Sequence, residues 1–203
     1  MKTPFDFFDQ FLVLSPEAKE LISETIDYQT FRKNTIILNI GVYNKYMYII
    51  KKGIVRGFIH NDKEEVTLSL WMENETFGDI STYITGAKTT KAYEALEDLE
   101  VYTVEIASFR ALFEKNHEIC NLGRIIVEQF VLKTERLKNA LRFTCPEDKL
   151  KQFIVNRPGL ISRVKLKQIA SYLNITPETL SRIRKSNLNL DSNKTKPSTE
   201  DCL

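Results

Sequence analysis

The stretch LKQIASYLNITPETLSRIRK, residues 166–185, contains two helical patterns separated by a short polar turn. Apolar residues on either side of the turn recur at the spacing of a single helix face: Leu166, Ile169, Ala170, Leu173, Leu180 and Ile183. Ala170 is small where two helices would approach closely. Asn174 tolerates the left-handed backbone that such a turn requires, and Thr176 followed by Pro177 is typical of a helix start. The stretch therefore predicts a helix-turn-helix.

The outer face of the second predicted helix, 177–185, carries charged and hydroxyl side chains. An arginine there can donate two hydrogen bonds to guanine, and a glutamate can accept one from cytosine, as binding in the major groove requires. The candidate contacts to double-stranded DNA are Lys165, Lys167, Thr176, Glu178, Thr179, Ser181, Arg182 and Lys185. The alternatives are an ordinary helical hairpin with a solvated face, and a small-molecule-binding signalling module whose basic helices dock on a protein. A protein-docking hairpin is expected to have an apolar outer stripe, so these residues favour DNA.

Charge is unevenly distributed along the chain. Residues 143–203 contain 11 Lys and Arg against 6 Asp and Glu, whereas residues 1–142 contain 18 against 21. The whole chain has a net charge of +2. The basic end agrees with a polyanionic partner, although a solvated basic face is also common in proteins that bind no anion.

Residues 28–106 are rich in β-branched and aromatic side chains, which crowd into short runs between glycine or polar clusters. The predicted strands include 35–38, 46–50, 54–59, 66–71 and 101–106, with turns at Lys52-Gly53 and at Asn61-Asp62-Lys63. Strands at this spacing predict a sandwich or barrel. A helix is expected to precede them, from Ser15-Pro16 to about Ile26.

A long amphipathic helix is predicted over 119–142, after a short helix around 109–113. Its apolar residues recur at three- and four-residue steps or their sum: Ile119, Leu122, Ile126, Phe130, Leu137 and Leu141. The two alternatives are a helix packed on its own barrel and a two-stranded coiled coil, and Gln129 and Lys133 near the seam leave both open. Three short helices are predicted over 146–187, followed by a disordered tail over 188–203.

The residues disfavour membrane, metal-binding and catalytic classes. Apolar runs fall far short of the roughly 20 residues of a spanning helix, and residues 1–14 make a poor signal peptide, so we expect a cytoplasmic protein without a membrane partner. The cysteines and histidines are too scattered for a disulfide framework or a metal site: Cys120, Cys145, Cys202, His60 and His117. The sequence has no Gly-rich phosphate loop and no nucleophile elbow, and Glu64-Glu65 predicts a solvated hairpin tip, so we expect no enzymatic activity.

The order of these segments over residues 5–187 resembles the Crp/Fnr transcription regulators of bacteria. The resemblance is carried by YIIKKGIVR at 48–56, FGD at 77–79, EALED at 94–98, the long helix, and Ser181-Arg182 in the helix-turn-helix. It implies an α+β protein with RNA polymerase as a partner and with base contacts from Glu178 and Arg182. The implied domains are an antiparallel β-barrel of the jelly-roll, cyclic-nucleotide-binding type at 1–118, a homodimerisation helix at 119–142, a DNA-binding domain at 143–187 and the tail at 188–203.

The resemblance also implies an effector pocket in the barrel. Its candidate residues are Phe77, Gly78, Asp79, Thr89, Thr90 and Lys91. In members that bind cyclic AMP the barrel has Phe-Gly-Glu and, a few residues on, an Arg-Ser or Arg-Thr pair that binds the cyclic phosphate. Here Asp79 replaces the glutamate, and Thr89-Thr90-Lys91 stands where Arg-Ser-Ala is expected. A buried phosphate needs a cation or several N–H donors, and lysine lacks the guanidinium fork. We therefore expect no cofactor and weak or no binding of cyclic AMP. The barrel either senses an effector that the sequence does not identify or serves only as a scaffold.

Overall fold

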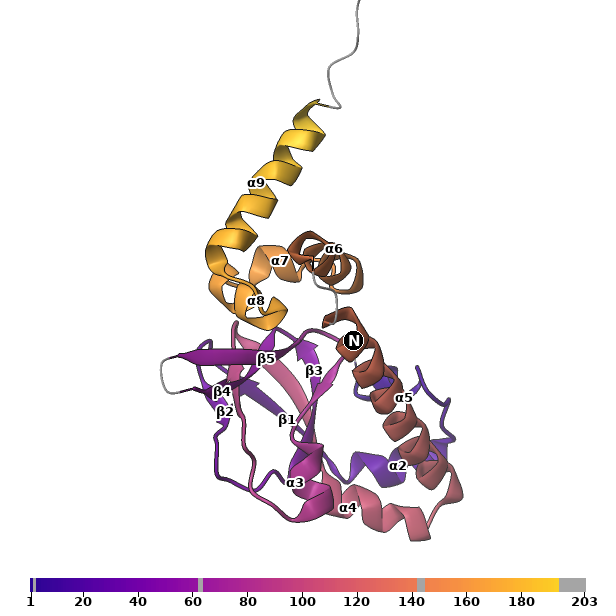
Figure 1. Cartoon of the computed structure of the whole chain (residues 1–203). Coiled ribbons are helices and arrows are strands. Elements are labelled where there is room, and N and C mark those ends of the chain that lie inside the picture. Colours follow the sequence, from indigo (N-terminus) through magenta and orange to yellow (C-terminus); the bar gives the residue numbers. More distant parts are fainter. Residues whose placement is uncertain (2, 62–63, 142–144, 194–203) are drawn as a thin grey trace, which may run out of the picture. The chain divides into compact units, whose positions relative to one another are not determined.

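The computed structural model describes residues 1, 3–61, 64–141 and 145–193 (Figure 1). The chain divides into two compact units, Met1–Leu137 and Lys138–Leu203. The first unit contains the strand-rich region and most of the predicted long helix, and the second unit is helical in its described part.

Strands of the first unit form two four-stranded sheets, in which every pairing is antiparallel (Figure 1). One sheet has the order β1-β8-β3-β6, and the other has the order β2-β7-β4-β5. The strands are β1 (Ile26–Phe31), β2 (Ile36–Leu38), β3 (Tyr46–Lys52), β4 (Val55–His60), β5 (Glu65–Trp71), β6 (Thr76–Phe77), β7 (Ala92–Ala95) and β8 (Leu99–Glu105). The predicted antiparallel sheet domain, called the barrel below, is therefore confirmed.

The first unit has two apolar cores, one on each face of the sheet β1-β8-β3-β6. Between the two sheets, Ile50 packs with Val55 and Tyr93. The other face is covered by α1 (Phe5–Phe8), α2 (Pro16–Ser23), α4 (Ile106–Ala111), the 3-10 helix η1 (Leu112–Glu114) and α5 (His117–Leu141). Ile119 and Leu122 of α5 are fully buried in this second core. The first part of the long helix thus packs on its own barrel, while the side chains of Leu137 and Leu141 lie outside the described ones.

The helix predicted from Ser15 to about Ile26 ends earlier than expected, at Ser23. The backbone N–H and the hydroxyl of Thr25 both donate to the carbonyl oxygen of Ile22, at 2.9 and 2.8 Å, and so close the helix. Ile26 then starts β1, where it pairs with Val104 of β8. The pairing with a buried strand overrides the local helical pattern because it completes the backbone hydrogen bonds of the sheet.

The second unit contains α6 (Pro146–Asn156), α7 (Leu160–Arg163), α8 (Leu166–Leu173) and α9 (Pro177–Asn193), four helices over its described residues rather than the three predicted. The additional one, α7, follows Gly159 in the left-handed conformation, with φ +86. The helix predicted to end near residue 185 continues to Asn193, so the predicted tail is helical from 188 to 193. No glycine or proline interrupts residues 178–196, which lets the helix extend. Residues 194–203, like Asp62 and Lys63 of the predicted hairpin turn, lie outside the described residues.

The turn between α8 and α9 has the predicted chemistry. Asn174 is left-handed, with φ 52 and ψ 53, and the N–H of Ile175 donates to the carbonyl oxygen of Ala170 at 3.0 Å. The hydroxyl of Thr176 accepts from the N–H of Thr179 at 3.2 Å and so caps the start of α9. These bonds satisfy backbone groups that a helix end leaves open.

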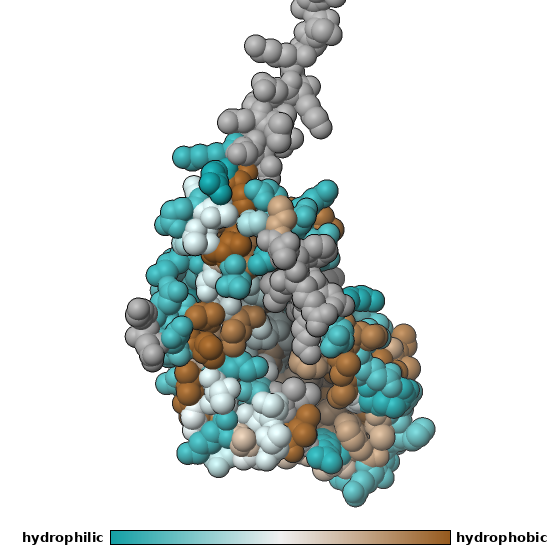
Figure 2. Space-filling view, viewed as in Figure 1, coloured by the Kyte–Doolittle hydropathy of each residue, from teal (hydrophilic) through white to brown (hydrophobic). Residues whose placement is uncertain are grey.

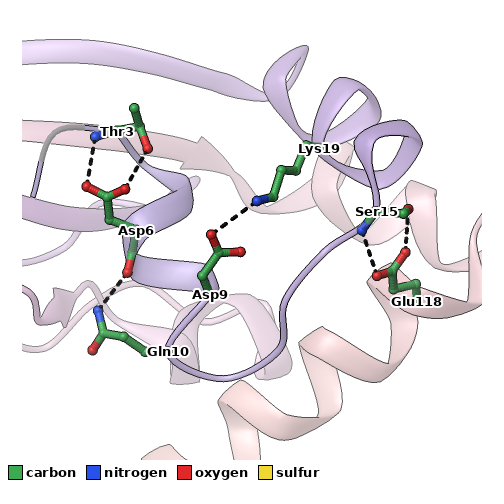
Figure 3. Close-up of polar contacts among 7 residues, drawn as sticks. All are labelled: Thr3, Asp6, Asp9, Gln10, Ser15, Lys19 and Glu118. Carbon is green, nitrogen blue, oxygen red and sulfur yellow. Dashed lines mark hydrogen bonds and ion pairs between the residues drawn. The ribbon is translucent and has the colours of Figure 1, made fainter.

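Glu118, in the first turn of α5, ties this helix to the start of α2 (Figure 3). Its carboxylate accepts from the backbone N–H of Ser15 at 2.9 Å and from the Ser15 hydroxyl at 2.6 Å. These two bonds lower the pKa of Glu118. The Ser15 hydroxyl also accepts from the N–H of Ala18 at 3.2 Å, so one serine caps α2 and binds α5.

We expect Ser15→Ala to destabilise the first unit by about 1 kcal/mol, because it removes both the cap and a bond to Glu118. Thermal unfolding followed by circular dichroism measures the loss. Ser23→Ala is the control, because the Ser23 hydroxyl donates to the carbonyl oxygen of Glu20 within the same helix.

Since the pKa of Glu118 is lowered in the folded chain, the stability that Glu118→Gln removes should be present above the ordinary pKa of a glutamate and should vanish as the pH falls through the lowered value. If Glu118→Gln lost more stability at acid pH than at neutral pH, the ionised contact of Glu118 with Ser15 would be contradicted.

We expect Asn174→Ala to destabilise the α8–α9 pair by about 1–2 kcal/mol, because alanine pays the steric cost of the left-handed conformation. Asn174→Gly should be tolerated, since glycine has no Cβ. Hydrogen-exchange rates of the amides in α8 measure the difference. Equal exchange in the alanine and glycine variants would show that the left-handed turn does not limit stability.

Candidate functional site

The candidate effector pocket starts where β6 ends. Phe77 is the last residue of β6, and Asp79 is the N-cap of α3 (Ile80–Thr85), a short helix that the sequence reading missed. Gly78 between them has φ +140, and a Cβ atom there would lie 3.1 Å from both Asn44 Nδ2 and the carbonyl oxygen of Tyr46. Glycine is therefore favoured at this position by its backbone conformation and by the close approach of the neighbouring chain. The N-cap Asp79 and the left-handed Gly86 after Thr85 are the sequence signals that predict α3.

The Asp79 carboxylate is only 2% exposed and is hydrogen-bonded at both oxygens. Oδ1 accepts from the N–H of Ser81 at 3.2 Å and from the Ser81 hydroxyl, and Oδ2 accepts from the Thr89 hydroxyl at 2.6 Å. Burial raises the pKa of Asp79, but the bonds from Ser81 and Thr89 and the charge of Lys91 outweigh it, so the pKa lies below its ordinary value. Asp79 is therefore a buried, ionised carboxylate at the start of α3.

Thr89 is as buried as Asp79 and is fixed by its backbone. Its N–H donates to the carbonyl oxygen of Val42 and its carbonyl oxygen accepts from the N–H of Gly41, both at 2.8 Å. The N–H of Lys91 donates to the Thr89 hydroxyl at 3.3 Å. The structure thus brings Asp79, Thr89 and Lys91 together, next to Phe77 and Gly78, and leaves Thr90 exposed.

Three buried aromatic side chains, Tyr48, Phe77 and Tyr93, lie between the sheets beside this cluster, and the partly buried Trp71 packs against them. Tyr48 and Phe77 stack with ring centroids 4.6 Å apart, and Trp71 stacks on Tyr93 at 5.5 Å. Phe77 joins the two pairs, at 5.9 Å from Tyr93 and 6.2 Å from Trp71. A Cβ atom on Gly57 would lie 2.8 Å from the Trp71 ring, so the absence of a side chain there makes room for the indole. Sequence analysis placed Tyr48 and Trp71 in strands, but not Phe77 or Tyr93, and it did not connect the four residues.

The Tyr93 hydroxyl lies in this interior. Tyr93 is fully buried, and its hydroxyl has no hydrogen-bond partner among the residues that the structure describes. Burial, and to a smaller extent the negative charge of Asp79, raise the pKa of Tyr93. The phenol is therefore neutral at physiological pH and faces the field of the carboxylate.

Arg56 of β4 is a second buried charge that the sequence reading missed. It is 5% exposed, it forms an ion pair with Glu65 of β5, and its Nη2 atom lies 3.0 Å from Glu94 Oε2 of β7. Its guanidinium carbon lies 4.1 Å from the ring centre of Phe58. Because the three charged residues come from three neighbouring strands, they fix the pairing of β4 with both of its neighbours.

The predicted DNA-contact residues lie on α8, on α9 and on the turn between them. Leu180 and Ile183 are buried, as the helical spacing predicted. The described side chains divide by exposure: Lys165, Lys167, Thr176, Glu178, Arg182 and Lys185 are exposed, and Thr179 and Ser181 are partly buried. The Thr179 hydroxyl is bonded to that of Thr176, at 3.0 Å. The Arg182 guanidinium contributes to the lowered pKa of Glu147, although the hydrogen bond from Cys145 is the larger cause.

The middle of α5 carries exposed apolar side chains. Val127, Phe130 and Val131 are 47%, 45% and 54% exposed, and their spacing places them on one side of the helix. Figure 2 shows hydrophobic residues over α5 among hydrophilic ones. Lys133, which interrupts the apolar pattern, lies with its Nζ atom 2.5 Å from Glu75 Oε1 of the first unit. Of the predicted seam residues whose side chains are described, Ile119, Leu122 and Ile126 pack in the core of their own unit, whereas Phe130 does not.

Among the described residues, none of the helices is both long and apolar enough to cross a membrane. The same residues contain no group of three or more His, Cys, Asp or Glu side chains arranged to hold a metal ion.

Comparison with known proteins relates the barrel to a known domain family. Residues 28–116 match the family described as "Cyclic nucleotide-binding domain". The chain is 26% identical over 130 residues to the global nitrogen regulator of Nostoc sp., a match that covers 63% of this chain. It spans only 58% of the length of that relative.

Solved structures are similar over most of the chain. A Crp/Fnr-family transcriptional regulator from Eubacterium rectale has a TM-score of 0.67 at 17% identity, covering 91% of this chain and 88% of its own. FixK2 from Bradyrhizobium japonicum has a TM-score of 0.68 at 18% identity, covering 87% and 89%. These similarities confirm the resemblance found in the sequence: the chain has the fold of Crp/Fnr transcriptional regulators.

Proposed function

We propose that this chain is a homodimeric, sequence-specific DNA-binding regulator of transcription that places α9 in the major groove. The observation that carries the proposal is the two-sidedness of α9: Leu180 and Ile183 are buried, and Glu178 and Arg182 are exposed one turn apart. The left-handed Asn174 and the Thr176 cap fix the start of this helix against α8. The similarity to transcriptional regulators supports the same function.

The exposed side chains of α9 are suited to reading bases. Arg182 offers the guanidinium fork that matches the O6 and N7 atoms of guanine, and Glu178 offers an acceptor for the amino group of cytosine. Lys165 and Lys167, at the start of α8, provide positive charges that attract backbone phosphates without reading sequence. A basic C-terminal part of the chain agrees with this division of roles.

The apolar side of α5 supports dimerisation. Val127, Phe130 and Val131 would be buried when two such helices pack together, which removes apolar area from water. A two-fold dimer presents two recognition helices to successive major grooves, so the DNA site would be palindromic, with half-sites about 10 base pairs apart. We further infer a bacterial cytoplasmic protein that acts on RNA polymerase, as the similarity to Crp/Fnr regulators implies.

We expect Arg182→Ala to weaken binding to the preferred site by about 1–3 kcal/mol while leaving binding to random DNA nearly unchanged. The preferred site is first selected from a random DNA library with the full chain. Lys167→Ala is the comparison, because a lost phosphate contact weakens all sequences alike and lowers the salt dependence. Fluorescence anisotropy at several salt concentrations separates the two patterns. An equal loss on both DNAs for Arg182→Ala would make it a phosphate contact, and selection of no preferred site would favour a protein as the partner.

We expect Phe130→Glu to raise the dissociation constant of the dimer by at least about tenfold, because it places a charge in the apolar contact. Sedimentation at micromolar concentration measures the association state. Sequence analysis put Gln129 near the predicted seam, but helical geometry places it away from Val127, Phe130 and Val131 at an exposed position of α5, so Gln129→Glu adds the same charge and should leave the dimer intact. A wild-type monomer, with and without DNA, would rule out the two-fold geometry.

A further inference from the structure

We infer that the barrel of this chain takes no cyclic nucleotide, because its aromatic side chains pack against one another between the sheets and because Thr89, which stands where the resemblance expects the phosphate-binding arginine, is bound to the Asp79 carboxylate. The statement about the barrel is independent of the proposed function. Its consequence, that DNA binding needs no cyclic nucleotide, rests on that function.

The ring space is filled by aromatic stacking. Trp71 lies on Tyr93 with a centroid distance of 5.5 Å and an interplanar angle of 28°. Phe77, the residue before the glycine of the pocket motif, stacks on Tyr48 at 4.6 Å and 11°. A purine needs a free ring face or an open slot, and these separations are those of rings in mutual contact. Gly57 shows that the backbone is adapted to the indole, because any Cβ atom there would collide with it.

The donors beside the predicted phosphate-binding position are bound to a carboxylate of the chain itself. The amide and hydroxyl of Ser81 and the hydroxyl of Thr89 all donate to Asp79. Thr89 stands where the resemblance expects the phosphate-binding arginine, so the group that would bind an anion is already bound to one. A phosphate beside Thr89 would lie near the charge of Asp79 without a guanidinium to offset it, because threonine stands in place of the arginine.

The Tyr93 hydroxyl fits the same interpretation. It is the polar group of these four rings that lacks a partner among the described residues. A neutral molecule as small as water satisfies one hydroxyl without moving the indole, whereas a nucleotide does not. The mutual contacts of the rings and the missing guanidinium therefore both disfavour the cyclic nucleotide that the domain family implies.

The first test is a titration of the full-length wild-type chain with cyclic AMP and cyclic GMP. The chain contains a single tryptophan, the partly buried Trp71, so its fluorescence reports on the aromatic cluster that it packs against. We expect no saturable change in fluorescence or in calorimetric heat up to about 1 mM nucleotide, the range of negligible affinity. A micromolar dissociation constant for either nucleotide would overturn the proposal, whatever the behaviour on DNA.

The second test removes the indole side chain of Trp71. Trp71→Ala should leave a cavity that free indole fills, so indole should raise the melting temperature of this variant by about 2–4 °C and leave the wild type unchanged. Trp71→Phe, which keeps a ring, should respond less. Ile84→Ala, at a side chain that is 71% exposed, is the control that should not respond. A folded Trp71→Ala chain that ignores indole would overturn the proposal, and if this variant does not fold, the wild-type titration decides.

DNA binding is measured separately on the selected site. We expect the same affinity, within about twofold, with and without 1 mM cyclic AMP, because a ligand without differential affinity cannot shift a conformational equilibrium. A large change would overturn the proposal. Failure to bind any DNA would instead contradict the proposed function. The proposal about the barrel would then be tested by the nucleotide titration and by the effect of indole on Trp71→Ala.

Discussion

Ile49 and Ile50 are neighbours on β3 and are both fully buried, so the sheet to which they belong must be covered on both faces. Successive side chains of a strand point to opposite faces, and the two isoleucines accordingly belong to different cores. Fully burying such a side chain contributes about 1.5–3 kcal/mol. The inner face requires the second sheet and its aromatic rings, and the outer face requires the helices. The placement of α5 and the aromatic packing between the sheets are thus two consequences of one sheet.

Local chemistry explains why some elements were predictable. The α8–α9 turn depends on Asn174 and on Thr176 followed by Pro177, which act within a few residues of themselves, and the structure has these helices where the sequence placed their facing ends. The predicted end of the N-terminal helix was wrong because Ile26 pairs with Val104 of β8, 78 positions away. A single sequence does not show that pairing. The predicted end of α9 was wrong for a different reason. Polarity alone suggested a disordered tail, whereas an uninterrupted run without glycine or proline extends the helix to Asn193.

The candidate pocket shows the same division. Phe77-Gly78-Asp79 was identified by its motif. The helix α3 is also predictable from local signals, because Asp79 caps its start and Gly86 ends it. The bond between Asp79 and Thr89 was not readable, because both side chains must be buried before their hydrogen bond becomes decisive. Arg56 is a further example. Its three-strand ion pair follows from the register of β4 with β5 and β7, which no local pattern gives.

The Trp71 ring lies against the Gly57 backbone, at the position that a Cβ atom would occupy. A glycine within a strand weakens it, so it needs a reason, and the indole lying where a Cβ atom would be supplies one. The two residues lie on adjacent strands, β4 and β5, and a side chain at 57 would force the indole to shift, because a Cβ atom there would lie 2.8 Å from the ring. A small residue at 71 would in turn leave the space beside Gly57 open. The glycine and the tryptophan are therefore adapted to each other, and the room that the glycine leaves is taken by another side chain of the same sheet.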